Sequence, residues 1–290
     1  MADSPPYAGL YINLDRSIER RRAIESQLRR FNLFNRYARF AAIEPKDVPA
    51  SAHVLPGESA CFHSHYQALK TGGTNGAAVH IMEDDVLLSA YLDHAARTLI
   101  ESDLFGFDIV FTDTFVHTEV MQLAFYKQAF DHALAGGKNA MKYTVLDLGQ
   151  RQMACMSSYF VAPRSIAKVL KIYEDELALG PRMPVDFCIR LAAQEDRLKI
   201  GCWFPFVTSI MLEQVTASTI AGRENQQSNP SVMLPALLRY SFFADRDLAG
   251  YAKGFLDAMI GNRSAKTVDA HRDLILDLLE FIVSGRYQNF

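Results

Sequence analysis

The sequence predicts an α/β protein with a mostly parallel central sheet and a helical appendage at its C-terminal end. Over the first 115 residues, short apolar runs alternate with longer segments of helical period, the order typical of a parallel sheet covered by helices. The apolar run at 77–82 ends in three consecutive acids. From about residue 225 the pattern changes to helix alone. We therefore predict one domain over 1–224 and an appendage over 225–290.

The first elements follow from apolar periodicity and helix signals. Residues 9–14 predict a first strand, and Ser17 is placed to cap the helix that follows it. Residues 40–43 predict a second strand, and 58–70 predict a helix closed by two glycines. The run at 77–82 is short and rich in β-branched residues, which predicts a buried parallel strand.

The middle of the chain continues the alternation and then breaks it. Ser89 is placed to cap a helix with an apolar inner face, and residues 107–111 predict a strand that ends near Asp113. Residues 116–153 are polar and lack a clear period. We interpret this stretch as an excursion that covers the site.

The later elements are again strands and helices. Residues 158–162 predict a strand, and a helix is predicted after Pro163. Pro184 stands at a favoured first position of a further helix, and residues 198–204 predict a late strand. In the tail, apolar positions between 268 and 282 recur at spacings of three and four, which predicts an amphipathic helix packed on the domain or on a partner.

Composition narrows the class of protein. The chain has 290 residues, of which 49% are apolar, enough for a large core. A net charge of −3 argues against nucleic-acid binding driven by a basic surface. The four cysteines show no CxxC pair or zinc-finger spacing, and the chain shows no signal-peptide pattern and no apolar run of ~20 residues. We expect a cytoplasmic protein, with any membrane contact peripheral at the inner face and its oligomeric state open.

Glu83, Asp84 and Asp85 are the strongest functional signal because they follow a predicted buried strand directly. Ligands of open α/β sheets bind beyond the carboxyl ends of the strands. Three acids there repel one another unless a cation joins them, and hard oxygen ligands favour Mg²⁺ or Mn²⁺, which commonly hold a diphosphate as well. The triplet predicts an enzyme that handles a nucleotide diphosphate. The alternative is a solvated strand end whose acids cap the next helix.

The end of the first strand carries a second group of polar side chains. Asn13, Asp15 and Arg16 offer an amide, a carboxylate and a guanidinium, which suit a base, a ribose and a phosphate respectively. The alternative for Arg16 is a solvated loop residue. Arg20, Arg21 and Arg22 predict a solvated helix face, with contact to an anionic membrane or lipid-linked acceptor as the less favoured interpretation.

The sequence resembles glycosyltransferase family 25, the lipopolysaccharide-type β-galactosyltransferases. Residues 11–21, Tyr-Ile-Asn-Leu-Asp-Arg-Ser-x-Glu-Arg-Arg, resemble the opening block of the family. Residues 55–66 and the acid-tipped strand at 81–86 resemble its second and third blocks. Residues 158–161 and 184–186 resemble later blocks. Three ordered blocks with this chemistry are specific, although any one of them alone is not.

The resemblance implies an A-type, Rossmann-like glycosyltransferase fold, a sugar-nucleotide donor that is usually UDP-galactose, and inversion at the anomeric carbon. It implies that a divalent cation, Mn²⁺ or Mg²⁺, neutralises the departing diphosphate. In this interpretation Asp85 is the first metal ligand and Glu83 the second, since alternate residues at a strand end share a face. Asp84 turns to the ribose or to a neighbouring donor.

Further residues take roles by the same resemblance. An inverting displacement needs a general base, for which Asp186 is the first candidate and Asp113 the competing one. Asp186 would also suit a helix N-terminus without any catalytic role. Glu213 is a further candidate metal ligand, and Glu58 and His65 are candidates on the donor side. Glu58 alternatively serves as a first-turn helix acid, and His65 as a satisfied core histidine.

A cysteine and a histidine near these motifs are of residue types that often carry function, but we predict structural roles for both. Cys61 is predicted to be a small buried apolar group, not a nucleophile. His80 is predicted to face the flank of the sheet as a structural residue.

The predicted function is metal-dependent, inverting transfer of a hexose, first of all galactose, from a UDP-sugar to lipopolysaccharide or another cell-envelope glycan. Its partners would be the nucleotide-sugar donor and a glycan or glycolipid acceptor, with no nucleic acid. Two alternatives remain. One is a catalytically degenerate relative that acts as a binding or scaffold protein. The other is a nucleotidyltransferase, which uses a metal at the same sheet edge but attacks phosphorus.

Overall fold

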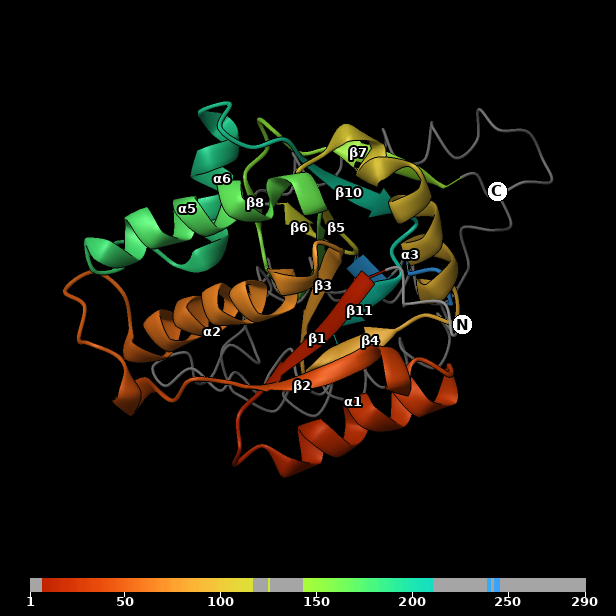
Figure 1. Ribbon diagram of the computed structural model, residues 1–290, viewed down its shortest axis with the longest axis horizontal. Helices are drawn as coiled ribbons and strands as arrows, with labels where there is room; N and C mark the ends of the chain where they lie inside the picture. Colours follow the sequence, from red (N-terminus) through yellow and green to blue (C-terminus); the bar gives the residue numbers. More distant parts are fainter. Residues whose placement is uncertain (1–6, 117–124, 126–142, 211–238, 241–242, 246–290) are drawn as a thin grey trace, which may run out of the picture.

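The computed structural model describes residues 7–116, 125, 143–210, 239–240 and 243–245 (Figure 1). They form a central sheet of seven strands in the order β2-β1-β3-β9-β5-β10-β7. The strands span β1 Tyr7–Asn13, β2 Tyr37–Ala41, β3 Ala78–Glu83, β5 Ile109–Phe111, β7 Thr144–Asp147, β9 Ser158–Val161 and β10 Ile200–Phe204.

The sheet is mostly parallel, which confirms the predicted fold class. Strand β1 pairs in parallel with β2 and β3, and β10 pairs in parallel with β5. Strand β9 lies between β3 and β5 and is antiparallel to both, and β7 is an antiparallel edge strand. Because β9 runs backwards, its amino end lies at the carboxyl edge of β3, where Glu83 N donates to Ser157 O over 2.8 Å. Ser157, the residue just before β9, therefore lies at the edge of the sheet that carries the acids.

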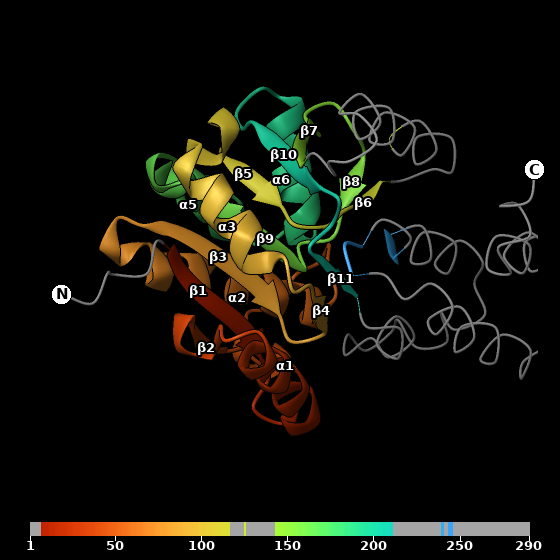
Figure 2. The same ribbon diagram turned by 90° about the vertical axis from the view of Figure 1, so that its right-hand side faces the viewer.

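Helices cover both faces of the sheet (Figures 1 and 2). One face packs against α2, α5 and α6, and the other against α1 and α3, so that two separate buried apolar clusters form. The helices span α1 Ile18–Arg30, α2 Pro56–Gly72, α3 Leu92–Glu101, α5 Ile166–Ala178 and α6 Val185–Gln194. Short 3₁₀ turns lie at Phe34–Arg36, Pro45–Asp47, Gly73–Asn75, Asp103–Gly106 and Pro163–Ser165.

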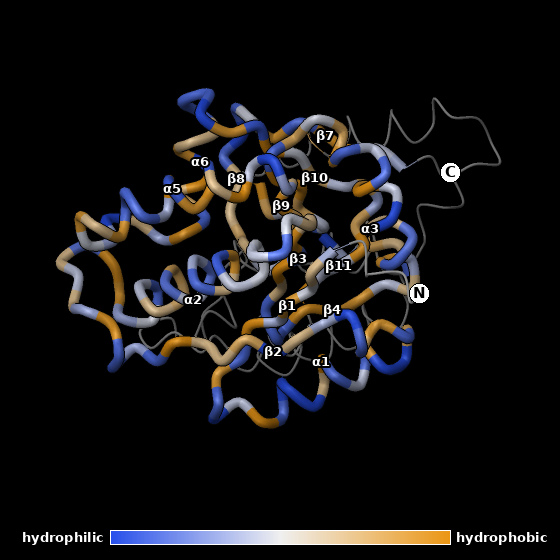
Figure 3. The backbone as a smooth tube through the Cα atoms, viewed as in Figure 1, coloured by the Kyte–Doolittle hydropathy of each residue, from blue (hydrophilic) through white to orange (hydrophobic). Residues whose placement is uncertain are grey.

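Strand β3 shows why the apolar runs read as buried strands. Val79 and Ile81 point into the cluster under α2, whereas Ala78 and Met82 point into the cluster under α1 and α3. A strand whose two faces are both covered must be apolar at every position, since successive side chains point to opposite faces. Figure 3 shows the same result as a hydrophobic band along the central strands.

The stretch at 116–153 departs from its predicted role in part. Residues Thr144–Asp147 form edge strand β7, and Met153–Ala154 form β8, which pairs with β6 at Phe115–Val116. These pieces belong to the sheet framework, so the excursion is shorter than predicted. The remainder, at 117–124 and 126–142, lies outside the described residues. One further antiparallel pair joins β4 Val86–Leu88, which directly follows the acids, to β11 Thr208–Ile210.

The predicted appendage at 225–290 is described only in two short pieces, which contact the domain. Ala244 N donates to Phe206 O over 2.8 Å, and Phe243 pairs with Phe206 in an isolated bridge. The predicted amphipathic stripe at 268–282 and the boundary at 224/225 lie outside the described residues. Within the described part of the chain, no helix is long and apolar enough to cross a membrane.

Candidate active site

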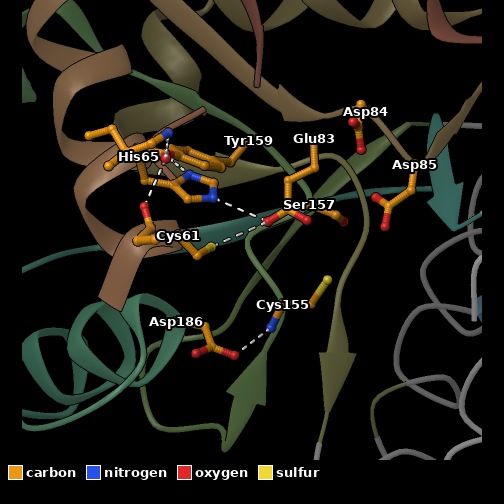
Figure 4. A network of polar contacts seen from close by, with 12 residues as sticks. Cys61, His65, Glu83, Asp84, Asp85, Cys155, Ser157, Tyr159 and Asp186 are labelled. Carbon is orange, nitrogen blue, oxygen red and sulfur yellow. Dashed lines mark hydrogen bonds and ion pairs between the residues drawn. The ribbon is translucent and has the colours of Figure 1, made fainter. Parts of the chain in front are cut away.

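The three acids lie at the carboxyl edge of β3, where the sequence predicted them (Figure 4). Glu83 is the last residue of β3, and Asp84 and Asp85 form the turn into β4. The turn is firmly held because β4 pairs with β11 on its far side. The three side chains diverge, however, and each has its own set of neighbours.

Asp84 is nearly buried and is bound by the end of β1. Its Oδ2 accepts a hydrogen bond of 2.6 Å from Asn13 Nδ2. Asn13 is in turn oriented by Arg39, whose Nε donates to Asn13 Oδ1 over 2.9 Å. Burial raises the pKa of Asp84 above its ordinary value, although the hydrogen bond from Asn13 and the charge of Arg20 oppose this effect. Asn13 therefore supports an acid of the triplet.

Arg20 corrects the prediction of a solvated arginine face. Its Nη1 lies 3.4 Å from Asp84 Oδ1 and 3.5 Å from Asp85 Oδ2, and its side chain is only 14% exposed. Arg21 and Arg22 do behave as predicted, since they are exposed and pair along the helix with glutamates. Helix α1 starts just beyond the carboxyl end of β1, so its first turn faces the acids. Position within the run of arginines decides which of them joins the site.

Asp85 has a strongly raised pKa because it is buried beside two other acids. Burial raises its pKa to about 7 and the negative charges of Glu83 and Asp84 add to the rise, whereas the charge of Arg20 and a backbone hydrogen bond oppose it. The single guanidinium of Arg20 does not balance the three neighbouring carboxylates, so the pKa of Asp85 stays raised. The oxygen donors of Asp85 and its neighbours fit Mn²⁺ or Mg²⁺, which would supply further positive charge.

Glu83 points toward helix α2. Its Oε1 lies 3.1 Å from His65 Nε2 and accepts a weak contact of 3.9 Å from Cys61 Sγ. Burial raises the pKa of Glu83, but the His65 hydrogen bond and the positive charges of Arg20 and Arg239 outweigh it, so the pKa lies below its ordinary value. Glu83 is thus held ionised. Among the His, Cys, Asp and Glu side chains in the described part of the chain, one group of three has its potential metal-ligand atoms all within 4.8 Å of one another. This group is Cys61, His65 and Glu83.

The remaining donor-side candidates take different positions. His65 is fully buried, and its Nδ1 lies 3.0 Å from Tyr159 Oη. The Glu58 carboxylate accepts a hydrogen bond from Leu55 N over 2.9 Å in the first turn of α2, the helix-capping arrangement. Asp15 and Arg16 lie at the exposed rim, where they pair with Arg39 and Glu44, respectively.

The two candidate bases differ in accessibility. Asp186, in the first turn of α6, is half-buried, and its Oδ2 accepts a hydrogen bond of 3.1 Å from Cys155 N. Asp113 is 1% exposed, and both of its oxygens are occupied: Oδ1 accepts from Ser157 Oγ and Oδ2 pairs with Arg239. An acceptor hydroxyl cannot reach Asp113 in this arrangement. Glu213 lies outside the described residues.

Arg239 is a site-edge residue that the sequence did not identify. It lies in the predicted appendage, yet its side chain is buried and contacts Asp113, Ser157 and Cys155. Asp113 and Arg239 are 126 positions apart, so no local pattern joins them. A lone arginine in a helix-like stretch gives no signal of its own.

A mostly parallel sheet with covered faces and three consecutive acids at its carboxyl edge agrees with a Rossmann-like glycosyltransferase fold. The family model of glycosyltransferase family 25, described as a lipopolysaccharide biosynthesis protein, matches residues 9–189, and the chain belongs to this family. The match confirms the resemblance read from the sequence blocks. No curated protein matches the chain at a significant level. Membership implies glycosyltransferase activity, with a sugar-nucleotide donor and a glycan acceptor.

Proposed function

We propose that the protein is a metal-dependent, inverting hexosyltransferase that moves galactose from UDP to lipopolysaccharide or another cell-envelope glycan. The observation that carries the proposal is Asp85 together with Asp84 at the carboxyl edge of β3, where one arginine faces two carboxylates. Family membership supplies the reaction class. We place the reaction in the cytoplasm, with peripheral contact to a membrane-bound acceptor.

On the donor side, we assign Asp85 as the first metal ligand and Glu83 as the second. When bound, a divalent ion supplies Lewis-acid stabilisation to the departing diphosphate. Asp84 and Asn13 are hydrogen-bonded to each other and keep the turn in place. Arg20 adds a fixed positive charge beside the same acids, which also suits an anionic leaving group.

On the acceptor side, we assign Asp186 as the general base. Its carboxylate is fixed by the backbone N–H groups of Cys155 and Phe187, at 3.1 and 3.0 Å, and remains partly exposed. Taking the proton from the acceptor hydroxyl as the anomeric carbon is attacked makes that oxygen a better nucleophile. The accessibility of Asp186 and the occupied oxygens of Asp113 favour this assignment over the competing one.

The donor assignment is tested by titrating UDP into the purified protein with Mn²⁺ and with excess chelator. We expect Mn²⁺ to tighten UDP binding in the wild type and to have no such effect in Asp85→Ala. Asp175→Ala is the matched control, because Asp175 is an exposed acid that pairs with Lys171 on α5, away from the sheet edge. Equal UDP affinity with Mn²⁺ and with chelator in the wild type would refute the metal assignment.

The donor sugar is identified by thermal shift with UDP-, GDP- and CMP-sugars, since a ligand of the native state raises its melting temperature. We expect UDP-galactose to give the largest shift in the presence of Mn²⁺. Hydrolysis or transfer of the bound sugar then separates an enzyme from a scaffold protein, which would give neither. Release of pyrophosphate from a nucleoside triphosphate would instead indicate a nucleotidyltransferase.

A further inference from the structure

Helix α2 and strand β3 bring a thiol, an imidazole and a carboxylate together beside the proposed donor site. Cys61 and His65 are four positions apart on α2, so both side chains leave the same face of the helix. In Figure 4 they reach toward Glu83, while the Asp85 carboxylate lies on the far side of Glu83. The metal assignment at Asp85 does not use the thiol or the imidazole.

We propose that Cys61, His65 and Glu83 form a three-ligand site for a thiophilic divalent metal ion of the Zn²⁺ class. The His65 Nε2 to Glu83 Oε1 distance is 3.1 Å, and the Cys61 Sγ to Glu83 Oε1 distance is 3.9 Å. Tetrahedral coordination with ordinary Zn²⁺ bond lengths separates nitrogen from oxygen by about 3.3 Å and sulfur from oxygen by about 3.6 Å. All three ligand atoms lie within 4.8 Å of one another, so rotations of the side chains that close the remaining gaps would place them on one ion.

The ligand types select the metal. Thiolate and imidazole favour Zn²⁺ and related borderline ions, whereas the oxygen-only surroundings of Asp85 favour Mn²⁺ or Mg²⁺. A carboxylate has two oxygens, so Glu83 can serve this ion through Oε1 and keep the other oxygen for an ion at Asp85. Binding displaces the proton of the Cys61 thiol to solvent, which leaves the thiolate as ligand.

The surroundings also fit a metal-bound histidine. His65 is fully buried, and Tyr159 Oη lies 3.0 Å from its Nδ1. An ion on Nε2 requires the proton on Nδ1, which then donates to the phenol oxygen of Tyr159. The side chain of Glu83 is 33% exposed, so an ion can enter from solvent on this side. A water molecule can then serve as its fourth ligand.

Co²⁺ is the probe, because it replaces Zn²⁺ in such sites and reports a thiolate ligand by a charge-transfer band. Metal-free protein titrated with Co²⁺ is expected to show this near-ultraviolet band together with intense visible bands of tetrahedral Co²⁺. Cys61→Ser should lose the charge-transfer band and bind Zn²⁺ at least ~10–100-fold more weakly. Cys188→Ala, at a buried cysteine on α6, is the control and should keep both. Absence of the band in the wild type, or its persistence in Cys61→Ser, overturns the site.

Two further variants protect the test against misfolding and against confusion with the donor site. Tyr159→Phe keeps the ring but removes the hydroxyl beside His65, and should weaken Zn²⁺ binding by ~10–100-fold with the charge-transfer band retained. Unchanged Zn²⁺ affinity in this variant contradicts the proposed histidine orientation. Asp85→Ala should retain the charge-transfer band while losing the coupling of Mn²⁺ to UDP. Loss of the band there would overturn the proposal that Cys61, His65 and Glu83 form a site independent of Asp85.

Discussion

The buried imidazole of His80 makes the stability of the fold depend on pH in a way that one substitution can isolate. His80 lies in the middle of β3, fully buried, with Nδ1 2.6 Å from Tyr37 Oη and Nε2 2.9 Å from Ser158 Oγ. Its ring stacks on Phe160 with centroids 4.0 Å apart. Burial lowers the pKa of His80 to about 3, so the imidazole stays neutral in the native state.

The magnitude follows from the two pKa values. The unfolded chain has an ordinary histidine pKa of about 6.5, so between pH 6.5 and pH 3 the unfolded state binds the proton and the native state does not. Stability is therefore unaffected above pH 6.5 and falls as the pH drops through this window. At pH 5 the linkage relation gives a loss of about 2 kcal/mol from this one residue.

Urea unfolding at pH 7.5 and pH 5.0 measures the effect, with the single tryptophan, Trp203, as a buried fluorescent probe. His80→Gln should be less stable than the wild type at pH 7.5, because it disturbs the hydrogen bonds and the stacking. Between the two pH values, however, it should lose about 2 kcal/mol less than the wild type. His53→Gln, at an exposed histidine, should keep the wild-type pH dependence. Equal losses in His80→Gln and the wild type would refute the reasoning.

Three further substitutions test the site and its framework. Arg20→Gln should lower the stability of the metal-free protein by about 1.5 kcal/mol, and Mn²⁺ should raise the melting temperature more than in the wild type, because the ion replaces the lost charge beside Asp85; equal shifts contradict this. Arg239→Ala should cost about 3–5 kcal/mol in urea unfolding, because it leaves a buried carboxylate unpaired; a loss below about 1 kcal/mol would count against that ion pair. Gly201→Ala should cost about 1–3 kcal/mol, because the new Cβ would lie 2.6 Å from Val145 Cγ1; unchanged stability would show that β7 yields.

The framework was predictable where the signal is local. The covered strands are apolar at every position, and the helices alternate with them, so element order and the edge that carries residues 83–85 followed from the sequence. The direction of β9 did not follow, because a short apolar run looks the same whichever way it pairs. The prediction therefore found the strand but missed that its start delivers Ser157 to Glu83.

The site was predictable only in outline, because its partners are set by tertiary contacts. The position of the three acids after β3 predicts them as site residues, but adjacent arginines look alike in sequence, so the run at 20–22 predicts solvent exposure for Arg20 as well. In the structure, Arg20 and Arg21 lie at different angular positions around α1. Arg20 faces Asp84, whereas Arg21 is exposed. The direction of the Glu83 side chain toward His65 is likewise a consequence of how α2 packs on the sheet.

The reversed strand also links the two halves of the proposed reaction. Just before β9, Ser157 O accepts from Glu83 N, while Cys155 N donates to Asp186. Three consecutive residues, 155–157, thus fix the last acid of β3 relative to the proposed base on α6. Cys155 has φ of 83°, a left-handed conformation that costs a non-glycine residue of order 1 kcal/mol and persists only where the surroundings enforce it. The hydrogen bonds at both ends of the segment provide that enforcement, so the separation of Glu83 and Asp186 is set by main-chain geometry and not by side-chain rotamers alone.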